Sequence, residues 1–159
     1  LIKNRYIHRT FISPEEHTRG KIVQLKLNPM PHILKGKKVA VIDDSIIRGT
    51  TSGKIIRMIR QAGARQVHLL ISSPPVRFPD FYGINTPNQK ELIASYKNHG
   101  EIAKQLGVDS LRYLSYKGLL KAIGIPEDSL CTSCFTGKYP IDIGDRKKEI
   151  NYSPAYEKI

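Results

Sequence analysis

The chain has 159 residues, which at about 100 to 200 residues per domain predicts one compact domain and excludes a large multi-domain protein. Hydrophobic residues make up 40% and charged residues 25%, which argues against intrinsic disorder, collagen and a coiled coil. The 26 Lys and Arg outnumber the 14 Asp and Glu, which gives a charge of +12. This charge favours an anionic partner over the alternative of a solvated basic surface with no particular ligand. The longest aliphatic run, residues 39–42, is far shorter than the about 20 residues that cross a bilayer, so no membrane partner is expected.

Alternating apolar and polar side chains over residues 23–27 predict a half-buried strand, and the stretch before it, residues 13–20, is polar. A basic turn then leads into residues 39–42. Because this second run is wholly apolar, it is expected to form a central strand that is buried on both faces.

The next segment, residues 52–62, carries three isoleucines at helical spacing, which predicts a helix. Thr51 or Ser52 would cap its first turn and Gly63 would end it. A further apolar run at residues 67–71 completes a strand–helix–strand unit, in which the two strands run parallel.

Four prolines between residues 74 and 87 predict a long irregular connection of the kind that is often functional. The remaining expected elements are helical pieces over 91–106 broken near residues 98–100, a strand over 111–114 and a helix over 117–123. The pattern therefore predicts an α/β fold with a mostly parallel central sheet flanked by helices and an irregular C-terminal segment. Residues 1–143 are expected to form the domain, and residues 144–159 a peripheral tail.

The residues with the clearest chemistry follow the apolar run at residues 39–42. Ligands of parallel α/β sheets bind at the carboxyl ends of strands, so a ligand is expected at this loop. Asp43 and Asp44 stand there, followed by Ser45 and by a small hydroxyl-rich stretch, residues 49–52, that opens the predicted helix. Free amide N–H groups at such a helix start can hold a phosphate, and the carboxylates can accept hydrogen bonds from sugar hydroxyls or help to hold a cation. The loop thus matches a ribose 5-phosphate.

The loop has two other interpretations. Residues 49–54, Gly-Thr-Thr-Ser-Gly-Lys, resemble a Walker phosphate loop, but that motif needs four residues between its glycines and Ser or Thr after the lysine. Here there are three, followed by Ile55, so an ATPase is rejected. The other alternative is an ordinary capped strand-to-helix turn decorated with surface acids.

The sequence over residues 39–52, Val-Ala-Val-Ile-Asp-Asp-Ser-Ile-Ile-Arg-Gly-Thr-Thr-Ser, resembles the phosphoribosyl pyrophosphate (PRPP) signature of the type I phosphoribosyltransferases. Flanking segments at residues 3–12, 72–75, 81–84, 91–94 and 134–140 are similar to the glutamine PRPP amidotransferase family. The resemblance covers nearly the whole chain. It lacks that family's N-terminal glutaminase half, which leads to the expectation that the chain is the C-terminal part.

The resemblance implies a glycosyltransferase, more narrowly a pentosyltransferase, that catalyses the first committed step of purine biosynthesis. In that reaction, ammonia from an upstream glutaminase domain replaces the pyrophosphate of PRPP and gives 5-phosphoribosylamine. Asp43 and Asp44 are assigned to the ribose hydroxyls and to Mg²⁺. The 5-phosphate is assigned to Ser45, Arg48, Gly49, Thr50 and Thr51.

In the family a mobile segment closes over PRPP, and the matching stretch is about residues 9–26. Arg9 and Lys26 at its ends are the candidates for catalytic contacts to the pyrophosphate on closure. The alternative is an ordinary solvated linker.

The only two cysteines, Cys131 and Cys134, stand three apart, a spacing that suggests a metal or redox site. Many members of the family carry a [4Fe–4S] cluster, and these cysteines match two of its ligands. A third ligand position matches Asp80, where relatives commonly have cysteine, and the fourth would lie upstream. The alternatives are a vestigial site and a dithiol switch.

The resemblance also implies inhibition by purine nucleotides, a homo-oligomer and a cytoplasmic location. A second class of function stays open, because some phosphoribosyltransferase folds are purine-sensing repressors that bind PRPP and DNA without catalysis. The charge of +12 suits that alternative, but no DNA-reading segment can be identified, so a nucleic-acid partner is not expected. A third alternative is a type I transferase acting on a nucleobase.

Overall fold

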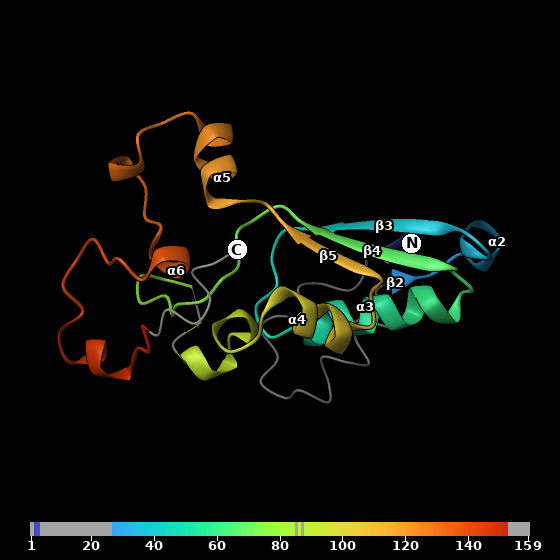
Figure 1. Cartoon of the computed structure of the whole chain (residues 1–159), viewed down its shortest axis with the longest axis horizontal. Helices are drawn as coiled ribbons and strands as arrows, with labels where there is room; N and C mark the ends of the chain where they lie inside the picture. The colour runs from blue at the N-terminus through green and yellow to red at the C-terminus, as the bar shows by residue number, and fades with distance from the viewer. Residues whose placement is uncertain (1, 4–26, 85, 87, 153–159) are drawn as a thin grey trace.

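A computed structural model describes residues 2, 3, 27–84, 86 and 88–152 of the chain (Figure 1). The polar stretch at residues 13–20 and all but Leu27 of the strand expected at 23–27 lie outside these residues. The strands are β1 (Ile2–Lys3), β2 (Leu27–Asn28), β3 (Lys38–Asp43), β4 (Gln66–Ile71) and β5 (Ser110–Tyr113). The α-helices are α2 (Pro31–Leu34), α3 (Thr50–Gln61), α4 (His99–Leu106), α5 (Tyr116–Ile123) and α6 (Ser133–Thr136). The 3-10 helices are η2 (Gln89–Glu91), η3 (Ile93–Ser95), η4 (Glu127–Ser129) and η5 (Gly144–Glu149).

The main sheet of the described residues has the strand order β3-β4-β5, and both of its pairings are parallel. Asp43 lies opposite Ile71, and Ile71 lies opposite Tyr113, so the three strands end together at one edge. β1 and β2 form a separate antiparallel pair. The predicted strand–helix–strand unit and the α/β class are confirmed.

Helix α3 starts two residues earlier than expected, and its N-cap is Gly49 in the left-handed conformation, with φ at 75°. The expectation of a Thr51 or Ser52 cap was wrong, because both residues lie inside the first turn of the helix. The other end agrees with the prediction, since Gly63 follows the last turn with φ at 89°. Gly49, which precedes both hydroxyl residues in the chain, therefore marks the start of the helix.

Helices α3 and α4 cover one face of the sheet (Figure 1). That face holds the core: Ile56 and Ile59 of α3 and Ile102 of α4 pack with Val67 and Leu69 of β4, all at most 2% exposed. Burying such aliphatic side chains is the main stabilising contribution to the fold, at about 1.5–3 kcal/mol each.

Strand β3 was expected to be central and buried on both faces, and that expectation was wrong for the described part of the sheet. β3 is an edge strand, β4 is central, and Ile42 on the uncovered face is 74% exposed. Among the described helices, none lies over this second face (Figure 1). An unbroken apolar run shows that both faces of a strand tolerate burial, but the neighbouring elements decide which face is covered.

The segments after β4 agree with the sequence pattern. The connection over residues 72–88 is irregular in its described part, apart from a single bridge between Asp80 and Thr86. The predicted break near residues 98–100 is the start of α4, where Asn98 and Glu101 form a reciprocal capping box. Helix α5 ends at Gly124, as expected.

In the C-terminal segment, Ile150 is buried and Asn151 exchanges hydrogen bonds with the side chain of Gln89. This part of the expected tail therefore packs against the domain, and the division at residue 143 stays a prediction.

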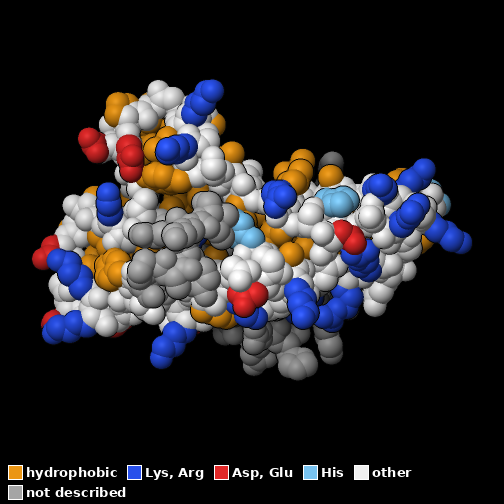
Figure 2. All heavy atoms as spheres, in the orientation of Figure 1, with side chains coloured by type: hydrophobic (Ala, Val, Ile, Leu, Met, Phe, Trp, Pro, Cys, Tyr) orange, Lys and Arg blue, Asp and Glu red, His pale blue; other side chains and the backbone are white. Residues whose placement is uncertain are grey.

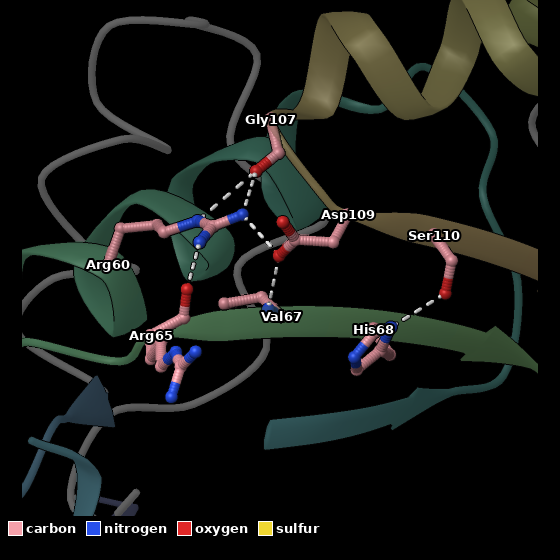
Figure 3. A network of polar contacts seen from close by, with 7 residues as sticks. All are labelled: Arg60, Arg65, Val67, His68, Gly107, Asp109 and Ser110. Carbon is pink, nitrogen blue, oxygen red and sulfur yellow. Dashed lines mark hydrogen bonds and ion pairs between the residues drawn. The ribbon is translucent and has the colours of Figure 1, made fainter. Parts of the chain in front are cut away.

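At the end of the sheet opposite Asp43, a polar network connects the end of α3 with the starts of β4 and β5 (Figure 3). Arg60 of α3 donates to the carbonyl oxygens of Arg65 and Gly107 and to the Asp109 carboxylate, which also accepts from the Val67 N–H. The Val67 N–H and the Arg60 guanidinium hold the pKa of Asp109 below its usual value. On the uncovered face His68 bonds the Ser110 hydroxyl at 2.8 Å, in line with a satisfied structural histidine.

Much of the positive charge that is visible in Figure 2 lies over α2 and α3. Lys35, Lys37 and Lys38 are exposed at the start of β3, and Arg57 and Arg65 are exposed around α3. None of the helices in the described residues is long and apolar enough to cross a membrane.

Candidate functional site

The candidate site lies where the three parallel strands end. Asp43 is the last residue of β3, and its carbonyl oxygen accepts from the backbone N–H of Ser72, just beyond β4, at 3.0 Å. The hydroxyl of Ser72 approaches the same oxygen at 3.3 Å. The loop that begins at Asp43 is therefore fixed at its start by the neighbouring strand.

The two adjacent carboxylates are both part of the local turn. Asp43 Oδ1 accepts from the N–H of Asp44 at 3.1 Å, and Asp44 Oδ1 accepts from the N–H of Ser45 at 2.7 Å and from its hydroxyl at 3.2 Å. In each carboxylate the hydrogen bonds from the described residues use Oδ1, so Oδ2 is left to accept a hydrogen bond from a ligand. Burial, together with the neighbouring Asp44 charge, raises the pKa of Asp43, and the Asp44 N–H opposes that rise.

The middle of the loop is tied to the core. Ile46 is 1% exposed and belongs to the main hydrophobic cluster, so the loop is anchored in the core shortly after the two acids. The carbonyl oxygen of Ile47 accepts from the N–H of Ile93 at 2.9 Å. A Cβ on Gly49 would lie 3.2 Å from Ile93 Cδ1 and 3.4 Å from Leu106 Cδ2. A glycine is needed here both for the left-handed backbone and for the close approach to these side chains.

The helix start then offers donors to the same edge. The N–H of Gly53 bonds the carbonyl oxygen of Gly49, so the amides of Thr50, Thr51 and Ser52 have no carbonyl partner within the helix. The helix dipole adds partial positive charge at this end. The arrangement can bind an anion at the helix start while the carboxylates of Asp43 and Asp44 accept hydrogen bonds beside it.

The sequence did not single out the partner of Arg48. Its guanidinium forms an ion pair with the carboxylate of Glu91, which is 43 residues away in the sequence. Glu91 lies in the segment 91–94 that carried part of the family resemblance, and this was the one signal that could have drawn attention to it. The assignment of Arg48 to a phosphate stays a prediction, now with its side chain engaged by a carboxylate.

The cysteine segment packs against the irregular connection that contains Asp80. The N–H groups of Arg77 and Phe78 donate to the carbonyl oxygen of Cys134 at 2.9 and 3.1 Å. Burial raises the pKa of the Cys134 thiol to about 11, and electrostatic repulsion from Asp80 and Cys131 adds to this rise. The three predicted ligands thus come from adjacent segments.

These three side chains are not arranged as a metal centre. The Asp80 carboxylate accepts from the N–H groups of Tyr82 and Ile84 at 2.9 and 3.1 Å, and both cysteines are free thiols. Within the described part of the chain, no three His, Cys, Asp or Glu side chains are placed to hold a metal ion. A four-iron cluster takes four ligands, and the predicted residues Asp80, Cys131 and Cys134 would supply three of them.

The lid candidates, Arg9 and Lys26, lie outside the described residues, so their roles stay predictions.

The chain is similar to curated amidophosphoribosyltransferases. It is 52% identical over 145 residues to that of Synechocystis sp., covering 91% of this chain and 29% of the relative. Identity to that of Methanocaldococcus jannaschii is also 52%, over 147 residues, covering 92% of this chain and 31% of the relative. The chain thus spans about 30% of the length of these curated relatives.

The structure is also similar to solved ones. The glutamine PRPP amidotransferase of Bacillus subtilis, complexed with ADP and GMP, has a TM-score of 0.75 and 50% identity, with 91% of this chain and 32% of that chain covered. A structure described as the allosteric regulatory enzyme of purine biosynthesis gives 0.75 and 46%, covering 95% and 34%. No protein-family model matches the chain. The resemblance noted in the sequence is therefore confirmed.

Proposed function

We propose that this chain, which is homologous over nine tenths of its length to amidophosphoribosyltransferases, is the PRPP-binding section of such an enzyme. The reaction would replace the pyrophosphate of PRPP with ammonia and give 5-phosphoribosylamine, the first committed step of purine biosynthesis. One observation carries the proposal: the loop over residues 43–52 combines an acidic strand end with a helix start at a single sheet edge. These two ends of the loop match the diol and the 5-phosphate of one sugar phosphate.

Different residues of the loop bind different parts of PRPP. The main-chain N–H groups of Thr50, Thr51 and Ser52 bind the 5-phosphate, supported by the hydroxyls of Ser45 and of the two threonines. Asp43 and Asp44 accept hydrogen bonds from the ribose hydroxyls. Gly49 lets the backbone take the left-handed turn that begins α3, and this turn directs the amides at the phosphate.

Positioning and charge supply the catalysis. Departure of the pyrophosphate leaves positive charge on the ribose ring, and carboxylates bound to the ribose hydroxyls would stabilise that charge. The oxygen donors of Asp43 and Asp44 also fit Mg²⁺, which, when bound with the substrate, neutralises charge on the pyrophosphate. No covalent nucleophile is needed from this chain.

The test is an ammonia-driven assay of pyrophosphate release from PRPP by the purified protein, together with calorimetric titration of PRPP in the presence of Mg²⁺. We expect saturable binding and stoichiometric formation of pyrophosphate and phosphoribosylamine. Binding without turnover would support only a PRPP-binding module, and absence of binding would contradict the proposal.

The lid is the second part of this proposal. Lys26→Ala is expected to slow ammonia-driven turnover by about tenfold or more while changing the dissociation constant of PRPP by less than about threefold, because the lysine would reach the pyrophosphate only on closure. Single-turnover rates and equilibrium titrations separate the two quantities. Lys35→Ala, an exposed lysine beside α2, serves as the control. An unchanged turnover number for Lys26→Ala would remove the lid assignment.

The iron–sulfur cluster is a separate proposal, in which Cys131, Cys134 and Asp80 supply three ligands of a [4Fe–4S] cluster. The packing of Cys134 against the Arg77–Phe78 backbone supports it, because this packing brings the two ligand-bearing segments together. Metal binding would also lower the raised pKa of the Cys134 thiol, since a coordinating thiol loses its proton. Nothing in the transfer reaction is routed through the cluster.

Replacing Asp80 with cysteine is expected to increase the iron and sulfide content of anaerobically purified protein, because thiolates hold such clusters more tightly than carboxylates. Chemical analysis of iron and sulfide and visible absorption check this for the wild type, Asp80→Cys and Cys134→Ser. Iron-free wild-type protein with full activity would rule out a required cluster, and iron that persists in Cys134→Ser would contradict the assigned ligand.

The remaining parts of the proposal concern the whole enzyme. An upstream glutaminase domain would supply the ammonia, and the chain would act in a cytoplasmic homo-oligomer. Inhibition by purine nucleotides is supported by the Bacillus subtilis structure, which is described as a complex with ADP and GMP. None of the comparisons favours the DNA-binding repressor, since the curated relatives described above are named as transferases.

A further inference from the structure

The loop over residues 43–52 is held from one side by a segment with no assigned role, residues 89–95. Two contacts are made by the main chain and core of this segment: Ile93 N–H donates to the Ile47 carbonyl oxygen at 2.9 Å, and Ile93 packs beside Gly49. The third is the ion pair between Glu91 and Arg48, the residue just before the helix-capping glycine. The backbone on both sides of Arg48 is thus fixed by one neighbouring segment.

The segment that presents Glu91 is itself firmly anchored. Gln89, the first residue of η2, is 9% exposed, and its side-chain amide bonds the carbonyl oxygens of Arg77 and Asn151 at 3.0 and 3.2 Å. Its Oε1 accepts from the Asn151 N–H at 2.7 Å, and its carbonyl oxygen accepts from the Ser95 hydroxyl at 2.8 Å. A buried amide with this many partners fixes the turn that carries Glu91.

We propose that Glu91 is a positioning residue for PRPP: it holds the Arg48 side chain so that the loop keeps the amides of residues 50–52 directed at the 5-phosphate. The inference rests on the proposed function. Arg48 then contributes mainly through its fixed backbone, and the guanidinium serves as the anchor of the loop. The Arg48 and Glu91 side chains are 36% and 43% exposed, and pairs with such exposure add little to global stability. The consequence of the pair lies in the shape of the loop.

The test is the substitution Glu91→Gln, which keeps the size of the side chain and removes its charge. If the released loop holds its binding conformation about a tenth of the time, the apparent dissociation constant of PRPP rises about tenfold. The Michaelis constant for PRPP should rise in parallel, while the turnover number at saturating PRPP stays within about twofold. The thermal midpoint should move by no more than about 2 °C.

A charge-reversed pair separates positioning from other effects. The double variant Arg48→Glu with Glu91→Arg is expected to recover at least half of the lost affinity for PRPP, because the anchor is rebuilt with opposite polarity. Asp109→Asn is the matched control, since it weakens another ion pair of similar exposure at the far end of the sheet. It should leave the affinity for PRPP within about twofold of the wild type.

The outcomes distinguish the two proposals. If the wild type binds no PRPP, the proposed function fails. If the wild type binds and Glu91→Gln binds equally well or more tightly, the positioning role is wrong, and tighter binding would indicate that Arg48 contacts the phosphate directly once it is freed. A charge-reversed pair with no recovery would also overturn the inference.

Discussion

The double variant Asp43→Asn with Asp44→Asn is expected to lower ammonia-driven pyrophosphate release from PRPP by at least about a hundredfold. Each carboxylate loses a charge-assisted hydrogen bond to the ribose, worth about 1.5–3 kcal/mol, and two such losses exceed the about 2.7 kcal/mol that corresponds to a hundredfold. Steady-state assays at several PRPP concentrations measure the change. Normal activity in the double variant would contradict the roles assigned to both acids.

The single variant Asp43→Asn shows whether such a loss reflects chemistry or unfolding. Burial raises the pKa of Asp43 above its ordinary value of 3.8, so the folded state binds this proton more tightly than the unfolded state does. The stability contributed by the protonated form is therefore present below about 3.8 and is lost as the pH rises through the raised pKa. At pH 7 the ionised Asp43 does not stabilise the fold. The thermal midpoint of Asp43→Asn at pH 7 should equal or exceed that of the wild type.

The second large effect is expected for Gly49→Ala. A non-glycine residue at φ of 75° costs about 1–2 kcal/mol, and the added Cβ, 3.2 Å from Ile93 Cδ1, must displace a fully buried side chain. We expect a loss of about 2 kcal/mol in the free energy of unfolding and at least about tenfold weaker PRPP binding. Chemical denaturation and calorimetric titration measure the two.

Gly107→Ala is the matched control, because Gly107 has nearly the same φ, 73°, and no atom within 4 Å of the added Cβ. It should lose only the backbone cost of about 1–2 kcal/mol and leave the affinity for PRPP unchanged. If both variants bind PRPP as tightly as the wild type, the close approach at Gly49 has no part in phosphate binding.

Local order could be derived from the sequence because it depends on neighbouring residues. The isoleucine spacing of α3, the glycine ends of α3 and α5 and the irregular proline-rich connection each follow from propensities within a few positions. The loop motif could be identified for the same reason, since its acids, glycine and hydroxyl residues are consecutive. The N-cap of α3 was predicted at Thr51 or Ser52 but lies at Gly49. The sequence could not decide between these residues, because glycine and hydroxyl residues both favour the N-cap position.

Contacts between distant segments were decided only by the tertiary structure. The sequence alone assigned β3 a central position, whereas the strand order β3-β4-β5 makes it an edge strand in the described sheet. Glu91 meets Arg48 across 43 residues, and Gln89 joins Asn151 across 62. Such pairs depend on how the elements pack, which periodicity does not encode. The sequence by itself identified the loop over residues 43–52 as the candidate for substrate binding, because its residues are consecutive, and only the packing of residues 89–95 against that loop decided how it is held.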